Sequence, residues 1–254
     1  MSRLLLGFIV AVVCTPAGVS GAFLLLPIQI QILGVPSPTV SATNLLFNVV
    51  ATSAGATAYA RHGAIDGPLL RRLLAGAVPG MVVGALLRST WFADEAVFAW
   101  PAAGVLVIVG VRLLADVVPR SPTPPLRRDL PAPGRIAAIG AAAGVIGGVY
   151  GIGGAALAVP WLVGVERLPV TRVAGAAMVV TLTTSTIGLG TFVAGDAFGF
   201  GQASAPNWVG GLALGLGGAI GAVVGAGLQQ HVPVRLLRVV LGLAAVSAGV
   251  RMVL

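Results

Sequence analysis

The chain is a succession of long apolar runs separated by short segments that carry most of its charges. Runs without a charged side chain, about 20 residues long on average, lie at roughly 38–60, 73–87, 96–111, 136–165, 173–195, 203–230 and 239–250. A helix needs about this length to cross the hydrocarbon of a bilayer. The pattern therefore predicts an all-α, polytopic membrane protein.

The apolar pattern occurs twice. Residues 18–27 read GVSGAFLLLP, and residues 151–160 read GIGGAALAVP, 133 positions later. At this offset Gly18, Gly21, Ala22, Leu24, Pro27, Pro36, Val40 and Gly55 align with Gly151, Gly154, Ala155, Leu157, Pro160, Pro169, Val173 and Gly188. This agreement predicts a duplication, with transmembrane repeats at 1–116 and 135–254 and a connector rich in proline and arginine at 117–134.

Each repeat opens with an apolar segment of about 30 residues that is interrupted near its middle. The interruptions are Pro-Ala-Gly at 16–18 and Tyr-Gly-Ile-Gly-Gly at 150–154. Proline removes a backbone donor, and adjacent glycines favour a break in a helix. Each segment then either spans the membrane as a broken helix or re-enters it as a hairpin.

The arginines favour the hairpin. If the segments span, ten arginines share one face of the membrane with the connector and five lie opposite. If they re-enter, each repeat crosses three times, the second repeat is inverted, and the division becomes twelve against three. Because positive loops stay in the cytoplasm, we expect inverted repeats with cytoplasmic loops at 61–72, 112–135, 166–172 and 231–238, and both termini outside.

Composition supports the membrane class and excludes several functions. Hydrophobic residues make up 57% of the chain, charged residues 9%, and the mean hydropathy is +1.02. The net charge of +8 comes from arginines between apolar runs, so it predicts topology and no nucleic-acid partner. The single Cys14 cannot form an internal disulfide, and neither a metal site nor another cofactor is predicted. Residues 1–22 resemble a signal peptide, but the same pattern recurs in mid-chain, so we expect them to be retained.

A polar stripe follows each break. Asn44, Asn48 and Thr52 recur every fourth residue, which places them on one helix face. The equivalent positions in the second half are Ala177, Thr181 and Ser185. Such side chains either join helices by hydrogen bonds or line a substrate pathway. The duplicated stripe beside duplicated breaks favours the pathway, because discontinuous helices in inverted repeats build transporter sites near the membrane centre.

The breaks indicate an anionic substrate. Half-helix N-termini present unpaired N–H groups, and glycine lets an anion approach them closely. The sequence places no charged residue near the centre of a span, so we expect main-chain and neutral donors, and no fixed positive charge, to bind it. The predicted substrate-binding residues are Gly18, Ser20, Gly21, Asn44, Asn48, Thr52, Gly151, Gly153, Gly154, Thr181 and Ser185.

Two glycine ladders, 76/80/84 and 217/221/225, predict close helix packing, within the chain or between copies in a homo-oligomer. Together with the motifs GVSGAFLLLP and GIGGAALAVP, they make nearly the whole chain resemble the sulfite exporter TauE/SafE family of membrane permeases. The resemblance implies a multi-pass transporter in the plasma membrane that carries sulfite, organosulfonates or related small organic anions. It implies no enzymatic activity.

Two other functions remain open at this point. Residues 18–21 read GVSG, the GxSG pattern that intramembrane serine proteases of the rhomboid type use around their nucleophile. Such a serine needs a histidine base, whereas His62 and His231 both fall beside loops, and Gly153 stands where the repeat would place a second serine. An anion channel is the other alternative, since it would need the same polar pathway.

Overall fold

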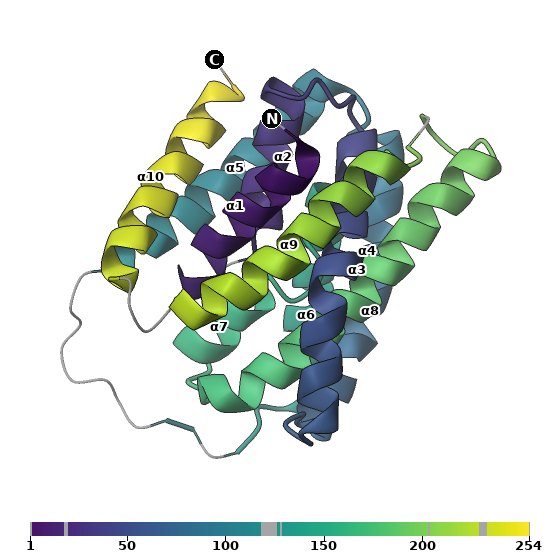
Figure 1. Ribbon diagram of the computed structural model, residues 1–254. Helices are drawn as coiled ribbons and strands as arrows, with labels where there is room; N and C mark the ends of the chain where they lie inside the picture. The colour runs from purple at the N-terminus through teal and green to yellow at the C-terminus, as the bar shows by residue number, and fades with distance from the viewer. Residues whose placement is uncertain are drawn as a thin grey trace.

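The computed structural model describes residues 2–17, 20–117, 126–127, 129–202, 204–228 and 233–253. Over these residues the chain forms ten α-helices and no β-strand (Figure 1). In chain order the helices are α1 (Arg3–Ala17), α2 (Ala22–Gln31), α3 (Thr39–Arg61), α4 (Gly67–Thr90), α5 (Glu95–Ala115), α6 (Pro133–Tyr150), α7 (Ala158–Gly164), α8 (Val170–Ala197), α9 (Trp208–Leu228) and α10 (Val234–Arg251).

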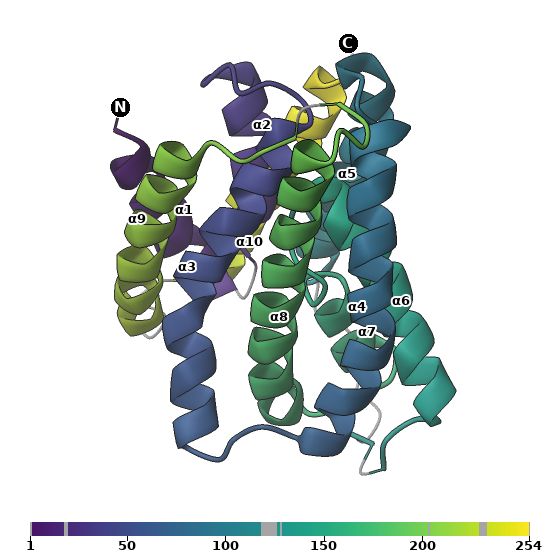
Figure 2. The ribbon, with the colours of Figure 1, turned by 90° about the vertical axis from the view of Figure 1, so that its right-hand side faces the viewer.

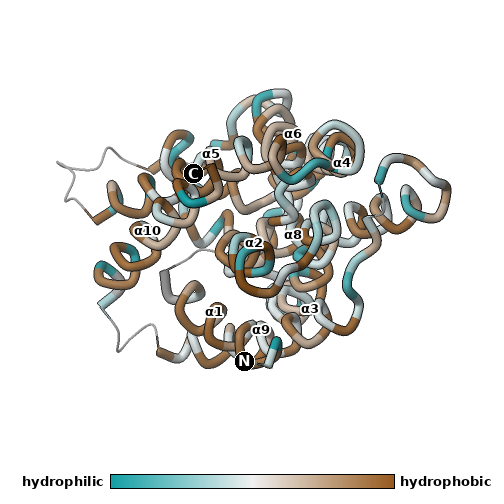
Figure 3. The backbone as a smooth tube through the Cα atoms, turned by 90° about the horizontal axis from the view of Figure 1, so that it is seen from above, coloured by the Kyte–Doolittle hydropathy of each residue, from teal (hydrophilic) through white to brown (hydrophobic). Residues whose placement is uncertain are grey.

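Four helices of the described part are long and apolar enough to cross a membrane, namely α4, α5, α8 and α9. Large apolar side chains point outward from them, as do Val83 on α4, Ile108 on α5 and Val223 on α9. Figure 3 shows hydrophobic residues all round the bundle when it is viewed from above. Such a surface suits lipid and not water. The all-helical class is confirmed, while the number of crossings stays a prediction.

The two halves of the sequence are interleaved. Helix α1 packs along α9, and α6 packs along α4, so each contact joins one half to the other. The glycine ladders make these contacts possible. A Cβ at Gly84 would overlap the carbonyl oxygen of Val145 on α6, and one at Gly221 would overlap that of Phe8 on α1. Close packing is therefore the role of both ladders, and the homo-oligomer stays a prediction.

The two predicted interruptions are real breaks between helices. Helix α1 ends at Ala17 and α2 begins at Ala22, and we call residues 18–21, of which 20 and 21 belong to the described part, the first break. Helix α6 ends at Tyr150 and α7 begins at Ala158, and we call residues 151–157 the second break. Gly151 and Gly153 have φ angles of 78° and 77°, in the left-handed region that favours glycine. The chain can therefore turn sharply there.

Each broken segment enters and leaves the bundle at one end. Arg135 in the first turn of α6 donates to Glu166, which follows α7, with 2.6 Å between Nε and Oε1. At the opposite end of the bundle, Figure 2 shows the start of α1 close to the same level as the outer end of α2. Both segments therefore have the form of helical hairpins, and the second break, at the tip of the second hairpin, lies inside the bundle.

Candidate functional site

The second break lies against α3 and α8, which run antiparallel beside each other. Gly153 is the centre of this contact. A Cβ built on Gly153 would lie 2.9 Å from Thr181 Cγ2, 3.0 Å from Ser185 Oγ and 3.6 Å from Asn48 Nδ2. Four of the predicted residues, one on α3, two on α8 and one in the break, are thus brought together.

Two polar atoms at this point have no hydrogen-bond partner. They are Asn48 Oδ1 and Ser185 Oγ, and both side chains are at least 99% buried. Asn48 Nδ2 makes one long hydrogen bond of 3.5 Å to the carbonyl oxygen of Gly151. An unpaired buried polar atom costs about 1 to 3 kcal/mol. A packed interior seldom keeps such atoms unless a ligand, ion or water uses them.

Thr184 engages one of the backbone donors of the second break. The N–H of Gly154 donates to Thr184 Oγ1 at 2.9 Å, and this hydroxyl donates in turn to the carbonyl oxygen of Val180 at 2.6 Å. The sequence predicted polar contacts at Thr181 and Ser185, whereas the hydrogen bond to the main chain of the break is made by Thr184. The predicted donor at Gly154 is therefore occupied in this conformation.

The first break is organised by Asn44. Its Nδ2 donates to the carbonyl oxygen of Ala22 at 3.0 Å, and its Oδ1 accepts from Gln29 Nε2 at 2.6 Å. Gln29 is fully buried, and its Oε1 has no partner. The polar stripe of α3 is thus divided between two sites, because Asn44 faces the first hairpin and Asn48 faces the second.

The remaining predicted residues lie around these two contacts. Ser20 Oγ accepts from the N–H of Ala22 at 3.4 Å. A Cβ on Gly21 would meet Val10 Cγ1 at 3.0 Å, so that glycine packs against α1. Thr52 donates to the carbonyl oxygen of Asn48 at 2.7 Å. The predicted residue Gly18 lies outside the described residues.

Arg88 is a functional candidate that directly follows the apolar run 73–87 in the sequence. Its side chain is fully buried near the end of α4. Nε donates to Ser41 Oγ at 3.0 Å, Nη1 donates to the carbonyl oxygen of Phe92, and Nη2 donates to Ser37 Oγ. The guanidinium carbon lies 3.6 Å from the centre of the Phe98 ring, a cation–π contact. A buried cation is therefore present near the end of α4, while the expectation that neutral donors bind the anion stays a prediction.

A signal for Arg88 was present in the sequence. It follows Gly84 by four residues and so continues the 76/80/84 ladder by one more turn. The ladder faces α6, and α6 ends at Tyr150. The arginine is therefore placed where the neighbouring helix stops and leaves room for a large side chain.

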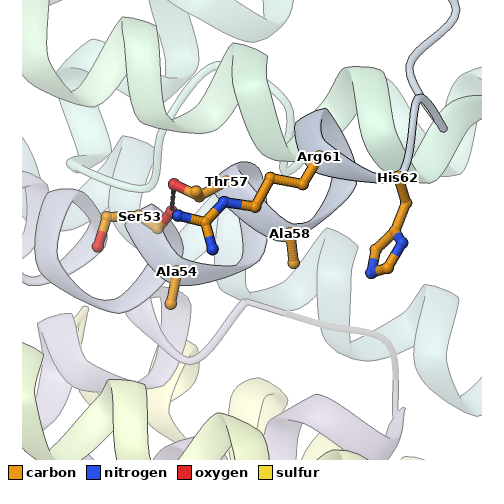
Figure 4. Close-up of a pocket in the computed structure, with 6 residues that line it drawn as sticks. All are labelled: Ser53, Ala54, Thr57, Ala58, Arg61 and His62. Atoms are coloured by element: carbon orange, nitrogen blue, oxygen red, sulfur yellow. Dashed lines mark hydrogen bonds between the residues drawn. The ribbon is translucent and has the colours of Figure 1, made fainter.

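A polar hollow of about 410 Å³ opens beside the carboxyl-terminal half of α3. Figure 4 shows Ser53, Thr57 and Arg61 along the helix, with His62 at its end. The residue before Ser53 is Thr52, the last of the polar stripe. The exposed polar residues of α3 thus follow the buried stripe along the chain, on a neighbouring face of the helix.

The chain matches a known protein family. The sequence model of the family described as sulfite exporter TauE/SafE matches residues 3–252, which include both breaks and both polar stripes. No curated protein and no solved structure matches the chain significantly.

Proposed function

Because the chain belongs to the sulfite exporter TauE/SafE family, we propose that it is a plasma-membrane permease for a small anion such as sulfite or an organosulfonate. The family is one of transporters and not of enzymes. The observation that carries the proposal is the pair of buried atoms without partners, Asn48 Oδ1 and Ser185 Oγ, on two helices that meet at a glycine break.

The residues around Gly153 suit an oxyanion. The hydroxyl of Ser185 is a free donor, and Asn48 Nδ2 carries a second N–H besides the one aimed at Gly151. Asn48 Oδ1 would accept from a hydroxyl or water that accompanies the anion. Glycine at position 153 leaves the main chain open to close approach. In this proposal the anion, with the water or hydroxyl that accompanies it, supplies the hydrogen-bond partners that Asn48 and Ser185 lack.

We propose further that the repeats, 1–116 and 135–254, are inverted copies whose hairpins re-enter the membrane. The support is that equivalent helices make equivalent contacts, since α1 packs on α9 as α6 packs on α4, and α3 packs on α9 as α8 packs on α4. The connector 117–134 is then cytoplasmic, and the polar hollow beside α3 opens toward the cytoplasm. An anion would travel from this hollow along Thr52 to Asn48.

The first test is a ligand screen on the purified protein in detergent. Thermal unfolding is followed with sulfite, sulfate, thiosulfate, sulfoacetate, lactate and chloride, because a ligand that binds only the folded state raises the melting temperature. Stabilisation by a sulfur oxyanion is the expected result. No stabilisation by any of these anions would contradict the proposal.

The second test locates the site. Asn48→Ala, Thr181→Ala and Ser185→Ala should each weaken binding of the stabilising anion by about 1 to 3 kcal/mol, the cost of a lost hydrogen bond to a charged group. Thr186→Ala is the matched control, because Thr186 lies on α8 next to Ser185 but is exposed and bonds only to its own helix. Equal affinity in all four variants would mean that the anion does not bind at this site.

The same protein in proteoliposomes distinguishes the alternatives. A permease gives saturable uptake of the labelled anion, whereas an anion channel gives unitary currents. The protease hypothesis rests on the GxSG pattern, and Ser20 is there engaged as an acceptor at the start of α2. Transport by Ser20→Ala would exclude a serine-centred mechanism.

A further inference from the structure

Arg88 lies at the level of the second break. Helices α4 and α6 run in the same direction. The glycines of the 76/80/84 ladder on α4 lie against residues 137, 141 and 145 of α6 in turn. One turn beyond Gly84, Arg88 donates to Ser41, and Ser41 donates to the carbonyl oxygen of Val149 at 3.1 Å. The guanidinium therefore sits beside the carboxyl end of α6.

No carboxylate bonds directly to Arg88 among the described residues, although Glu95 at the start of α5 attracts its charge from farther away. All its hydrogen bonds go to neutral acceptors, namely Ser37, Ser41 and the carbonyl of Phe92, and among the described residues no acid lies within ion-pair distance. The end of α6 contributes only about half a negative charge. A buried cation is costly without a partner of opposite charge. Glu95 is exposed to solvent, which screens its charge, so the only direct partners of the guanidinium are neutral.

This charge is close to the site around Gly153. Ser41, which bonds to Arg88, also packs on Gly151, where a Cβ would lie 2.8 Å from Ser41 Cα. Asn48 lies two turns from Ser41 on the same helix, about 10 Å along its axis. No direct contact between Arg88 and an anion at Gly153 is needed, because charges act over this distance in a poorly solvated interior.

We propose that Arg88 is the fixed charge that attracts the anion to the second break and that it makes the site prefer dianions over monoanions. The inference rests on the proposed function. At about 10 Å and an effective dielectric constant of about 20, one positive charge strengthens the binding of a monoanion roughly tenfold and that of a dianion roughly a hundredfold. The substrate class is accordingly a small oxyanion with two negative charges.

The position equivalent to Arg88 in the second repeat carries no charge. At the offset of 141 residues that aligns the glycine ladders, Arg88 corresponds to Gln229. The second ladder therefore continues into a neutral residue. The two breaks differ in charge although their glycines are duplicated, so we assign the dianion to the second break alone.

The experiment compares sulfate, a dianion, with methanesulfonate, a monoanion of similar shape, by binding to the purified protein at one ionic strength. Arg88→Gln should weaken sulfate binding about ten times more than methanesulfonate binding, whereas Arg88→Lys should keep the wild-type ratio. Arg71→Gln is the control, because Arg71 is exposed on the same helix. Melting temperatures report whether each variant is folded.

A second pair of variants leaves the arginine in place. Ser37 lies in the loop before α3 and accepts from Arg88, so Ser37→Asp adds a carboxylate beside the guanidinium and neutralises it. Ser37→Asn is its uncharged control. Ser37→Asp should lower the ratio of sulfate to methanesulfonate affinity as Arg88→Gln does, and Ser37→Asn should not.

The outcomes separate three explanations. Equal losses for both anions in Arg88→Gln and an unchanged ratio in Ser37→Asp would overturn the inference and leave Arg88 as a residue that only positions the loop before α3. Binding of neither anion by the wild-type protein, together with no binding of sulfite, would overturn the proposed function and this inference with it. A changed ratio in both neutralised variants supports the inference.

Discussion

The hydroxyl of Tyr150 donates to the carbonyl oxygen of Phe23 at 3.1 Å and so joins the last residue of α6 to the first turn of α2. The two residues are 127 positions apart, and both are buried. The Tyr150 ring also lies 6.4 Å from that of Phe98, which packs on Arg88. One side chain therefore connects the tips of both hairpins to the buried cation.

Tyr150→Phe should lower the melting temperature in detergent, because the carbonyl of Phe23 would lose its side-chain partner in a dry interior. The expected loss is about 1 to 3 kcal/mol in the free energy of unfolding. Tyr59→Phe, the only other tyrosine replacement that the chain offers, is the control. Equal melting temperatures for the two variants and the wild type would mean that this bond adds nothing to stability.

Gly154→Val and Gly21→Val should abolish anion uptake into proteoliposomes while leaving protein in the membrane. A Cβ at Gly154 would lie 2.9 Å from Thr184 Cγ2, and one at Gly21 would lie 3.0 Å from Val10 Cγ1, so valine would crowd either break. Ser20→Ala should cost much less, because Gly153 fills the equivalent place without a hydroxyl. Normal uptake by both valine variants, with activity lost in Ser20→Ala, would refute a main-chain site.

The ion pair between Asp66 and Arg172 should contribute to stability at neutral pH and be lost in acid. Desolvation raises the pKa of Asp66, but the hydrogen bond from the Leu69 N–H and the ion pair with Arg172 outweigh it, so the pKa lies below the ordinary value. A lowered pKa in the folded state stabilises the protein above the ordinary value of about 3.9, and this contribution fades as the pH falls below it.

Asp66→Asn tests this, since asparagine can still cap α4 but cannot form the ion pair. The variant should melt below the wild type at neutral pH, by a free energy within about 1 kcal/mol, and the difference should shrink in acid. Asp94→Asn, at the cap of α5, is the control. A difference that grows as the pH falls would have the wrong sign for this assignment.

Cysteine labelling tests the proposed topology. Once Cys14, which is buried, has been replaced, single cysteines at positions 2, 121 and 197 are exposed to an impermeant thiol reagent in intact cells and in inverted vesicles. Ser2→Cys and Ala197→Cys should react from outside and Ser121→Cys from inside. Reaction of the cysteines at 2 and 121 from the same side would rule out inverted repeats with re-entrant hairpins.

Much of the arrangement of the candidate site was predictable because duplication fixes equivalent positions. The four-residue spacing of the stripe predicted that Asn48, Thr181 and Ser185 face something polar, and Gly153 lies between them. The division of the stripe was not predictable. Spacing places Asn44 and Asn48 on one helix face, but which hairpin each contacts depends on how deep the two tips reach into the bundle.

Arg88 shows a different limit. It directly follows the apolar run 73–87, and the sequence alone gives only its position along its own helix. Burial depends instead on the neighbours, and here α6 stops beside it while Phe98 and the loop before α3 cover it. Thr184 is absent from the predicted residues for a similar reason, because its bond to Gly154 depends on the turn of the break.

The interleaving of the halves has a consequence for biogenesis. Helix α4 exposes a glycine groove until α6 has been made and fills it. Helix α1 packs on α9, whose first residue is synthesised about 200 residues later. At 5 to 20 residues per second this interval is roughly 10 to 40 s. A nascent first half therefore stays in the bilayer with one unfilled groove and one unattached helix. Quality control that recognises such surfaces would act on chains stalled near the connector.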